Sequence, residues 1–179
     1  MTPPARLRLD DRLPDRPRIL FVGINPGMTS ASINHHFAGP SNRFWKLLYE
    51  ARLTPVLMGP EDDDHLMTAA RYGFTNLVAR PTPGIDTLRR EEYLAGVRVL
   101  GAKIRRVQPS LVALVGVTLG RVLFSRRPGE PVTPGLQTER FEGARVFVLP
   151  NPSGRNAHYS YAQMVTAFRA LAAVSRRWP

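Results

Sequence analysis

Two short turns, each directly after an apolar run, carry the side chains best suited to chemistry. Residues 23–27 read GINPG after a run that begins at Arg18, and residues 151–154 read NPSG after one that begins at Arg145. Apolar runs of this length are typical of buried strands. In an open α/β sheet, strand exits that share one edge form the crevice where ligands bind. We therefore predict that both turns line one cleft.

Asn25 is the polar side chain of the first turn. Pro26 restricts the residue before it to extended geometry, Gly23 permits close approach of the backbone to a ligand, and Gly27 leaves room beside the turn. A carboxamide held in this way can position a water molecule against a reacting centre. An ordinary strand-exit turn is the alternative, since Asn, Pro and Gly are common turn residues.

Further motifs lie between the two turns, and the ordered set resembles the mismatch-specific uracil-DNA and thymine-DNA glycosylases of the uracil-DNA glycosylase superfamily. The motifs are residues 35–37 (HHF), 39–40 (GP), 42–45 (NRFW), 73–78 (GFTNLV) and 80–84 (RPTPG). The resemblance covers most of the chain. It implies a three-layer α/β/α fold with a central, mainly parallel sheet.

The same resemblance implies a function. These enzymes flip a base out of duplex DNA, and flipping is least unfavourable for a mismatched base. The chain is accordingly expected to be a monofunctional DNA repair glycosylase that hydrolyses the N-glycosidic bond of uracil in mismatched double-stranded DNA. Thymine and other altered pyrimidines stay open as substrates, and no cofactor is implied. The alternative is a non-catalytic, mismatch-sensing DNA-binding module of the same fold.

The resemblance also gives the first motifs their roles. The family asparagine that matches Asn25 orients the attacking water, and the backbone around it, at Gly23, Ile24 and Gly27, contacts the base. Phe37 matches an aromatic ring that stacks on the flipped base. The alternative for Phe37 is a place in the hydrophobic core.

Three more residues are assigned to the base by this resemblance. Ser30 matches a residue that faces carbon 5 of the base. His36 matches a histidine of the thymine branch and could donate to a base oxygen, although a plain loop histidine is the alternative. Asn151 matches a residue that contacts the base or the DNA backbone.

The second turn continues into a predicted DNA contact formed by Ser153, Gly154, Arg155 and Asn156. The uracil branch has leucine then serine after NPSG, whereas this chain has arginine and asparagine, which resembles the thymine branch. We predict that Arg155 fills the gap left by the flipped nucleotide, since an arginine plane can stack and also meet phosphate. A surface arginine is the alternative.

Asp86 is a second catalytic candidate. It lies in residues 83–87 (PGIDT), which follow a segment that the resemblance places near the cleft. A carboxylate there could activate water better than an amide. The alternative is that Asp86 or Thr87 caps a helix beginning near Leu88.

Composition supports a DNA partner and a single domain. The 179 residues carry a formal charge of +11, and 23 of the 25 basic residues are arginine, which suits bidentate phosphate contacts. Cysteine is absent, which excludes disulfides and thiolate-bound metals. We expect a flexible segment at residues 1–17, one glycosylase domain at residues 18–179, a monomer, a cytoplasmic location and no membrane span.

The elements that position these residues alternate between strands and helices. Beyond the two strands already named, helical spacing of apolar residues predicts helices at residues 42–52 (capped by Ser41), 61–72, 89–106 and 160–177, with a strand at 111–115 and a flexible loop at 126–134. The acids at 61–64 with His65 could be read as a metal site. Acids in a first helical turn are stabilising without an ion, so no metal is predicted.

Overall fold

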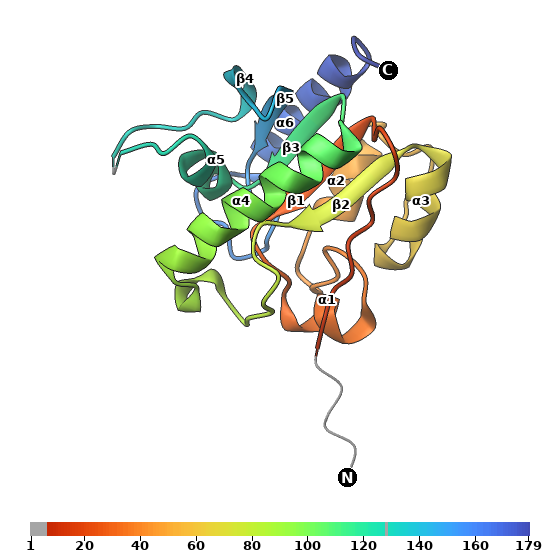
Figure 1. Ribbon diagram of the computed structural model, residues 1–179. Helices are drawn as coiled ribbons and strands as arrows, with labels where there is room; N and C mark the ends of the chain where they lie inside the picture. Colours follow the sequence, from red (N-terminus) through yellow and green to blue (C-terminus); the bar gives the residue numbers. More distant parts are fainter. Residues whose placement is uncertain (1–6, 128) are drawn as a thin grey trace.

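Five strands form one mixed sheet in the order β2-β1-β3-β5-β4 in the computed structural model (Figure 1). The structure describes residues 7–127 and 129–179. The strands are β1 (Ile19–Gly23), β2 (Tyr72–Asn76), β3 (Leu111–Val115), β4 (Gly135–Phe141) and β5 (Ala144–Leu149). All neighbours pair in parallel except β4, which is antiparallel to β5 at the edge. The carboxyl ends of four strands therefore share one edge.

Helices cover both faces of this sheet (Figure 1). They are α1 (Met28–Ile33), α2 (Phe44–Glu50), α3 (Asp63–Ala69), α4 (Arg90–Val107), α5 (Val117–Leu123) and α6 (Tyr161–Ser175), with short 3₁₀ turns at Pro60–Asp62 and Ile85–Thr87. No helix among the described residues is both long and apolar enough to cross a bilayer.

Strand side chains alternate between two cores. Phe21, Phe74 and Phe147 point to the face covered by α2, α3 and α6. Leu20 and Val112 point to the opposite face, where they pack against α4 and α5. Because both faces are buried, the parallel strands read as continuous apolar runs rather than as alternating ones. The predicted α/β fold with helices on both sides of a mainly parallel sheet is confirmed.

Two predicted helix boundaries are wrong. Ser41 does not cap α2, which begins at Phe44 with its first N–H donating to the Asn42 side-chain oxygen at 2.9 Å. The helix predicted over residues 61–72 ends at Ala69, because Tyr72 already belongs to β2. Helical spacing of apolar residues continued through the boundary and concealed the strand.

Strands β2 and β4 were not predicted. Gly73 interrupts the apolar run of β2, and the structure shows why it is needed, since a Cβ atom there would lie 2.8 Å from a Leu20 methyl carbon and 3.2 Å from the Arg12 carbonyl oxygen. Strand β4 is an edge strand whose residues alternate between half-buried and exposed. Its Gln137, Glu139 and Arg140 resemble a loop in composition. Edge strands commonly carry such charged residues.

Part of the predicted flexible N-terminal segment packs on the sheet. Arg12 forms an antiparallel bridge with Phe74, its N–H donating at 2.8 Å and its carbonyl accepting at 2.7 Å. Asp11 is also tied down, by Thr75 at 2.6 Å and by Lys103 at 2.7 Å. Residues 11 and 12 of the predicted flexible segment 1–17 are thus paired with the sheet and with α4, and residues 1–6 lie outside the described residues.

Candidate active site

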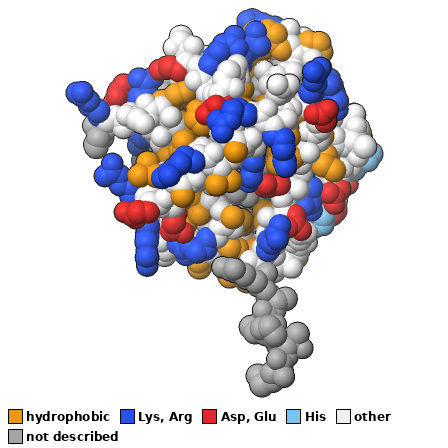
Figure 2. All heavy atoms as spheres, viewed as in Figure 1, with side chains coloured by type: hydrophobic (Ala, Val, Ile, Leu, Met, Phe, Trp, Pro, Cys, Tyr) orange, Lys and Arg blue, Asp and Glu red, His pale blue; other side chains and the backbone are white. Residues whose placement is uncertain are grey.

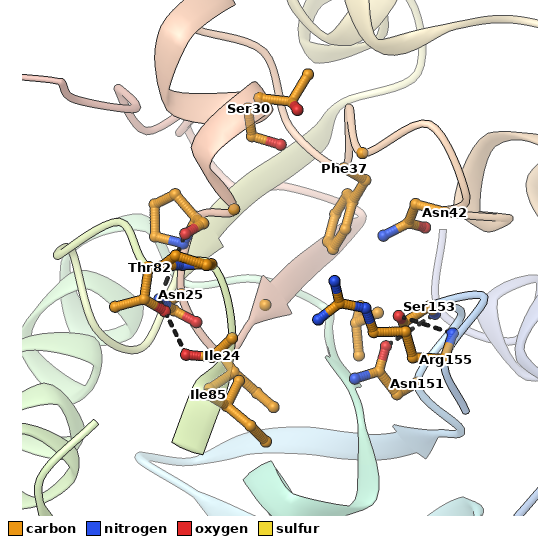
Figure 3. Close-up of a pocket in the computed structure, with 18 of the residues that line it drawn as sticks. Ile24, Asn25, Ser30, Phe37, Asn42, Thr82, Ile85, Asn151, Ser153 and Arg155 are labelled. Atoms are coloured by element: carbon orange, nitrogen blue, oxygen red, sulfur yellow. Dashed lines mark hydrogen bonds between the residues drawn. The ribbon is translucent and has the colours of Figure 1, made fainter. Parts of the chain in front are cut away.

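An open cleft of ≈ 800 Å³ lies between the two Asn-Pro turns at the carboxyl ends of the parallel strands (Figure 3). The two turns thus share one cleft, as their positions after strands predicted. Its wall contains the predicted residues Gly23, Ile24, Asn25, Gly27, Ser30, His36, Phe37, Asp86, Asn151, Ser153, Arg155 and Asn156. Gly154 does not line the cleft but packs against the lining residue Ser41, since a Cβ atom at Gly154 would come within 2.8 Å of the Ser41 Cβ.

The Asn25 carboxamide has a fixed orientation. Its Nδ2 donates to the Arg80 carbonyl at 2.9 Å and to Thr82 Oγ1 at 2.7 Å. A carbonyl can only accept, and the Thr82 hydroxyl donates its own proton to the Gly84 carbonyl at 2.7 Å, so the nitrogen must face both groups. Oδ1 of Asn25 has no partner among the described residues. It therefore remains free to accept a hydrogen bond.

A second chain segment runs beside the first turn and makes this contact possible. Beyond the paired strands, Leu77 N–H donates to the Gly23 carbonyl at 2.8 Å and Val78 N–H to the Ile24 carbonyl at 2.9 Å. Thr82 N–H then donates to the Pro26 carbonyl at 3.1 Å. The segment that follows β2 is therefore aligned with residues 23–26, which brings Thr82 beside the Asn25 amide (Figure 3).

Gly23, Asn76 and Phe37 meet at one wall of the cleft. A Cβ atom at Gly23 would lie 2.4 Å from Asn76 Oδ1 and 3.4 Å from Phe37 Cε1, so only glycine allows this approach. The Asn76 amide lines the cleft with no partner among the described residues. The Phe37 ring lines the cleft and stacks on the buried Phe44 ring with centroids 3.9 Å apart. This wall offers a flat ring beside a free amide.

His36 is oriented by a carboxylate. Its side chain is buried, and its Nδ1 lies 3.1 Å from Asp63 Oδ2. Burial lowers the pKa of His36, and the hydrogen bond and charge of Asp63 oppose this shift. Nε2 is buried without a partner among the described residues. Nδ1 is engaged by Asp63, so Nε2 is the ring nitrogen left to meet a base, and donation from His36 to a base oxygen stays a prediction.

The second turn is closed by its own hydrogen bonds. Asn151 Oδ1 accepts from Ser153 N–H at 3.0 Å, and its carbonyl accepts from Asn156 Nδ2 at 2.9 Å. The turn is attached to the start of α2 because Arg43 N–H donates to the Pro152 carbonyl at 3.0 Å. The Nδ2 group of Asn151 is left without a partner among the described residues, as a donor on the cleft wall (Figure 3).

Ser30 and Asp86 differ in how firmly they are held. Ser30 is buried, and its Oγ accepts from Ala38 N–H at 2.9 Å. Asp86 is exposed at the rim of the cleft, in the turn Ile85–Thr87. It does not cap the next helix, α4, which begins at Arg90. The residue before that helix, Arg89, donates its N–H to the Glu92 carboxylate at 2.9 Å. The capping alternative for Asp86 is therefore wrong.

Comparison with known proteins decides the family. Residues 11–172 match the family model of the Uracil DNA glycosylase superfamily. The chain belongs to this superfamily. Its fold is also similar to the solution structure of a candidate uracil DNA glycosylase from Methanosarcina acetivorans, with a TM-score of 0.67 over 96% of this chain and 98% of that one, at 19% sequence identity.

As a uracil-DNA glycosylase superfamily protein, the chain acts on DNA, and its charge suits that partner. Figure 2 shows lysine and arginine side chains spread across one face and interspersed with acids, rather than gathered into one patch. Such a distribution provides a general attraction to a polyanion.

The residues that sequence reasoning missed are Asn76 and Thr82. Both belong to motifs noted for their resemblance, but neither was singled out, because the strand ending at Asn76 was not predicted. A strand there would have placed a third polar side chain, Asn76, at the same sheet edge as Asn25. The hydroxyl of Thr82 gave no signal of its own, since Thr is ordinary in a proline-rich loop.

One group of potential metal ligands occurs among the described residues. His35, Asp63 and Asp64 bring their ligand atoms within 4.8 Å of one another, and His65 is not part of the group. The Arg12 guanidinium already contacts these acids, with Nε 2.6 Å from Asp64 Oδ1. The positive charge of the Arg12 guanidinium would repel a metal cation entering this group. The three residues therefore do not fit a metal site.

Proposed function

We propose that the chain is a monofunctional DNA glycosylase that hydrolyses the N-glycosidic bond of uracil in mismatched duplex DNA, with the base flipped into the cleft. The observation that carries this proposal is the Asn25 amide, whose donor side is held by Arg80 and Thr82 while its oxygen is free in the cleft. This geometry suits a residue that positions a water molecule. Thymine and other altered pyrimidines are further candidate substrates.

The base-binding wall supports a pyrimidine. A flipped ring stacked on Phe37 gains about 1 to 3 kcal/mol, which offsets much of the few kcal/mol needed to unstack it from the duplex. Asn76 offers an N–H donor and a carbonyl acceptor, the complement of the adjacent carbonyl and N–H on the uracil edge. Ser30 lies on the same cleft wall, where it would face carbon 5.

The chemistry then needs a water and a stabilised leaving group. Asn25 Oδ1 accepts a hydrogen bond from the water, which orients the water oxygen toward the sugar carbon. An amide is a poor general base, so stabilisation of the departing uracil anion by donors in the cleft supplies much of the rate, and uracil is expelled more readily than thymine. Asp86, at the rim, is the alternative group for activating the water.

The second turn contacts the DNA around the flipped nucleotide. Asn151 presents a free donor to the base or backbone. Arg155 is exposed at the mouth of the cleft, from which its side chain can enter the gap in the stack (Figure 3). Ser153, Gly154 and Asn156 keep this turn in place. The same surface would serve a protein that only senses mismatches, so turnover has to be measured.

Release of free base tests the proposal. Purified protein is incubated with duplexes containing G·U, A·U or G·T and with single-stranded uracil DNA, and free base is quantified. We expect release from G·U to be fastest. Activity should survive EDTA, because the proposed chemistry uses no metal. Borohydride should trap no protein–DNA adduct, because neither turn contains a lysine that could form a Schiff base. Binding to G·U duplex without base release would instead identify a mismatch-sensing module.

A further inference from the structure

Asp63 is a buried carboxylate outside the cleft wall, at the start of α3. Its side chain is 0% exposed. It accepts hydrogen bonds from His36 N–H at 3.0 Å, from His36 Nδ1 at 3.1 Å and from His35 Nδ1 at 2.9 Å. The Arg12 guanidinium adds an ion-pair contact, with Nε 3.4 Å from Asp63 Oδ1. One carboxylate therefore holds the backbone and both rings of two consecutive residues.

The negative charge of Asp63 is neutralised by its own partners, so it is not free to act on a ligand. Burial alone would raise the pKa of Asp63, but the hydrogen bonds from His36 and His35 and the Arg12 guanidinium hold that pKa well below its ordinary value. Burying a carboxylate is strongly unfavourable unless its charge and lone pairs are satisfied in this way. Such a complete set of partners points to a role in fixing the segment it binds.

That segment contains a strained aromatic residue. Phe37 has φ 54°, in the left-handed region that bulky side chains rarely adopt. The peptide groups on both sides of it are held from outside, by Trp45 Nε1 donating to the His36 carbonyl at 3.1 Å and by Ala38 N–H donating to Ser30 Oγ at 2.9 Å. Such a conformation persists only when the surroundings over-determine it.

We propose that Asp63 is a positioning residue that locks the segment around Phe37, so that the Phe37 ring stands as a rigid platform on the cleft wall. Phe44 supports one face of this ring with centroids 3.9 Å apart. The other face is left for a flat ligand. The identity of that ligand as a flipped base rests on the proposed function, whereas the hold of Asp63 on the segment does not.

Amide hydrogen exchange tests the hold directly. Asp63→Ala removes both carboxylate oxygens, so His36 N–H and its ring lose the Oδ2 atom that both contact. We expect exchange at His36 and Ala38 to quicken at least about tenfold, while amides of β1 stay within a few-fold of wild type. Tyr72→Phe is the matched control, because it removes a buried hydrogen bond to the Leu53 carbonyl away from the cleft.

Base release tests the consequence for Phe37. We expect Asp63→Ala to slow single-turnover release from a G·U duplex about tenfold, and Phe37→Ala to slow it at least as much. If Asp63 acts through Phe37, the double variant should be no slower than Phe37→Ala alone. Tyr72→Phe should leave the rate within about twofold. All assays are run at a temperature where each variant is folded.

Trp45→Phe provides a second test if Asp63→Ala does not fold. It removes the indole donor to the His36 carbonyl, so amide exchange at Ala38 should quicken. Base release should slow as well, and combining Trp45→Phe with Phe37→Ala should slow it no further than Phe37→Ala alone. Unchanged exchange at His36 and Ala38, or losses that multiply in the double variant, would overturn the proposal. A wild-type protein that releases no base would refute the proposed function, and the exchange measurement would still decide the role of Asp63.

Discussion

The two Asn-Pro turns look alike in sequence and present opposite chemical groups. Both follow parallel strands and line one cleft. The first turn has its amide nitrogen held by Arg80 and Thr82, which leaves the Asn25 oxygen free. In the second, the Asn151 oxygen is held within its own turn by Ser153, which leaves the nitrogen free. An amide's role thus depends on which half of it the fold has already engaged.

The largest expected effect on the rate of base release comes from removing the free oxygen of Asn25. Asn25→Ala should slow base release at least about 100-fold, equivalent to about 2.7 kcal/mol, because the lost contact with water acts mainly in the transition state. Affinity for a G·U duplex should stay within a few-fold. Single-turnover kinetics and titration of labelled duplex measure the two quantities. A rate equal to wild type would remove Asn25 from the mechanism.

Loosening the hold on Asn25 should cost less. Thr82→Val keeps the shape of the side chain but removes the acceptor for Asn25 Nδ2, so the amide can rotate away from its working orientation. We expect base release to slow about tenfold, with duplex affinity unchanged. Thr82→Ser, which retains the hydroxyl, is the control. Equal rates for the Val and Ser variants would show that Arg80 alone suffices to orient the amide.

An aspartate exchange separates the two turns. Asn151→Asp keeps the oxygen that accepts from Ser153 but deletes the free donor, so we expect duplex binding to weaken about tenfold with little loss of stability. Asn25→Asp instead places a carboxylate against the Arg80 carbonyl and should lower the melting temperature. Thermal unfolding and duplex titration of both variants check this reversal. A lower melting temperature for Asn151→Asp but not for Asn25→Asp would contradict the view that Asn25 presents a free oxygen and Asn151 a free nitrogen.

Arg155 should show a smaller, substrate-dependent effect. If its side chain fills the gap left by the flipped nucleotide, Arg155→Ala should slow release from a G·T duplex more than from single-stranded uracil DNA, which has no stack to refill. Arg98→Ala, on the exposed side of α4, is a control for loss of one charge. Equal slowing on all duplexes, with a salt slope lower by about one unit, would indicate a phosphate contact instead.

The smallest effect concerns acid stability at the loop that carries Thr82. The Arg80 side chain, hydrogen-bonded to Glu92, and the Arg89 N–H lower the pKa of Glu92 to about 2 from its ordinary 4.5. A lowered carboxyl pKa stabilises the fold above pH 4.5, and this contribution is lost as pH falls toward 2. Arg80→Ala should therefore flatten the decline in stability across that interval. Urea unfolding at several pH values measures the slope, which exposure of the pair keeps small.

Local patterns predicted the parts of the site that are local in sequence. The apolar runs and the Asn-Pro turns located β1, β5 and the cleft between them, because strand exits in a parallel sheet share one edge. Asn76 was missed because glycine and polar residues interrupt β2. The contacts of Asn25 with Thr82 and of His36 with Asp63 join positions 57 and 27 residues apart, and no pattern within either segment reports them.

The long-range hold on Asn25 also has a consequence for the order of folding. The amide gains its orientation only when the segment after β2 has aligned beside residues 23–26, a contact that closes a loop of 57 residues. Non-local contacts of this kind form late, after their loop-closure entropy has been overcome. A nascent or partly unfolded chain can therefore retain its positive charge and attach to DNA before it is able to cut a glycosidic bond. Under the proposed mechanism, cleavage would begin only once the segment after β2 has folded beside the first turn.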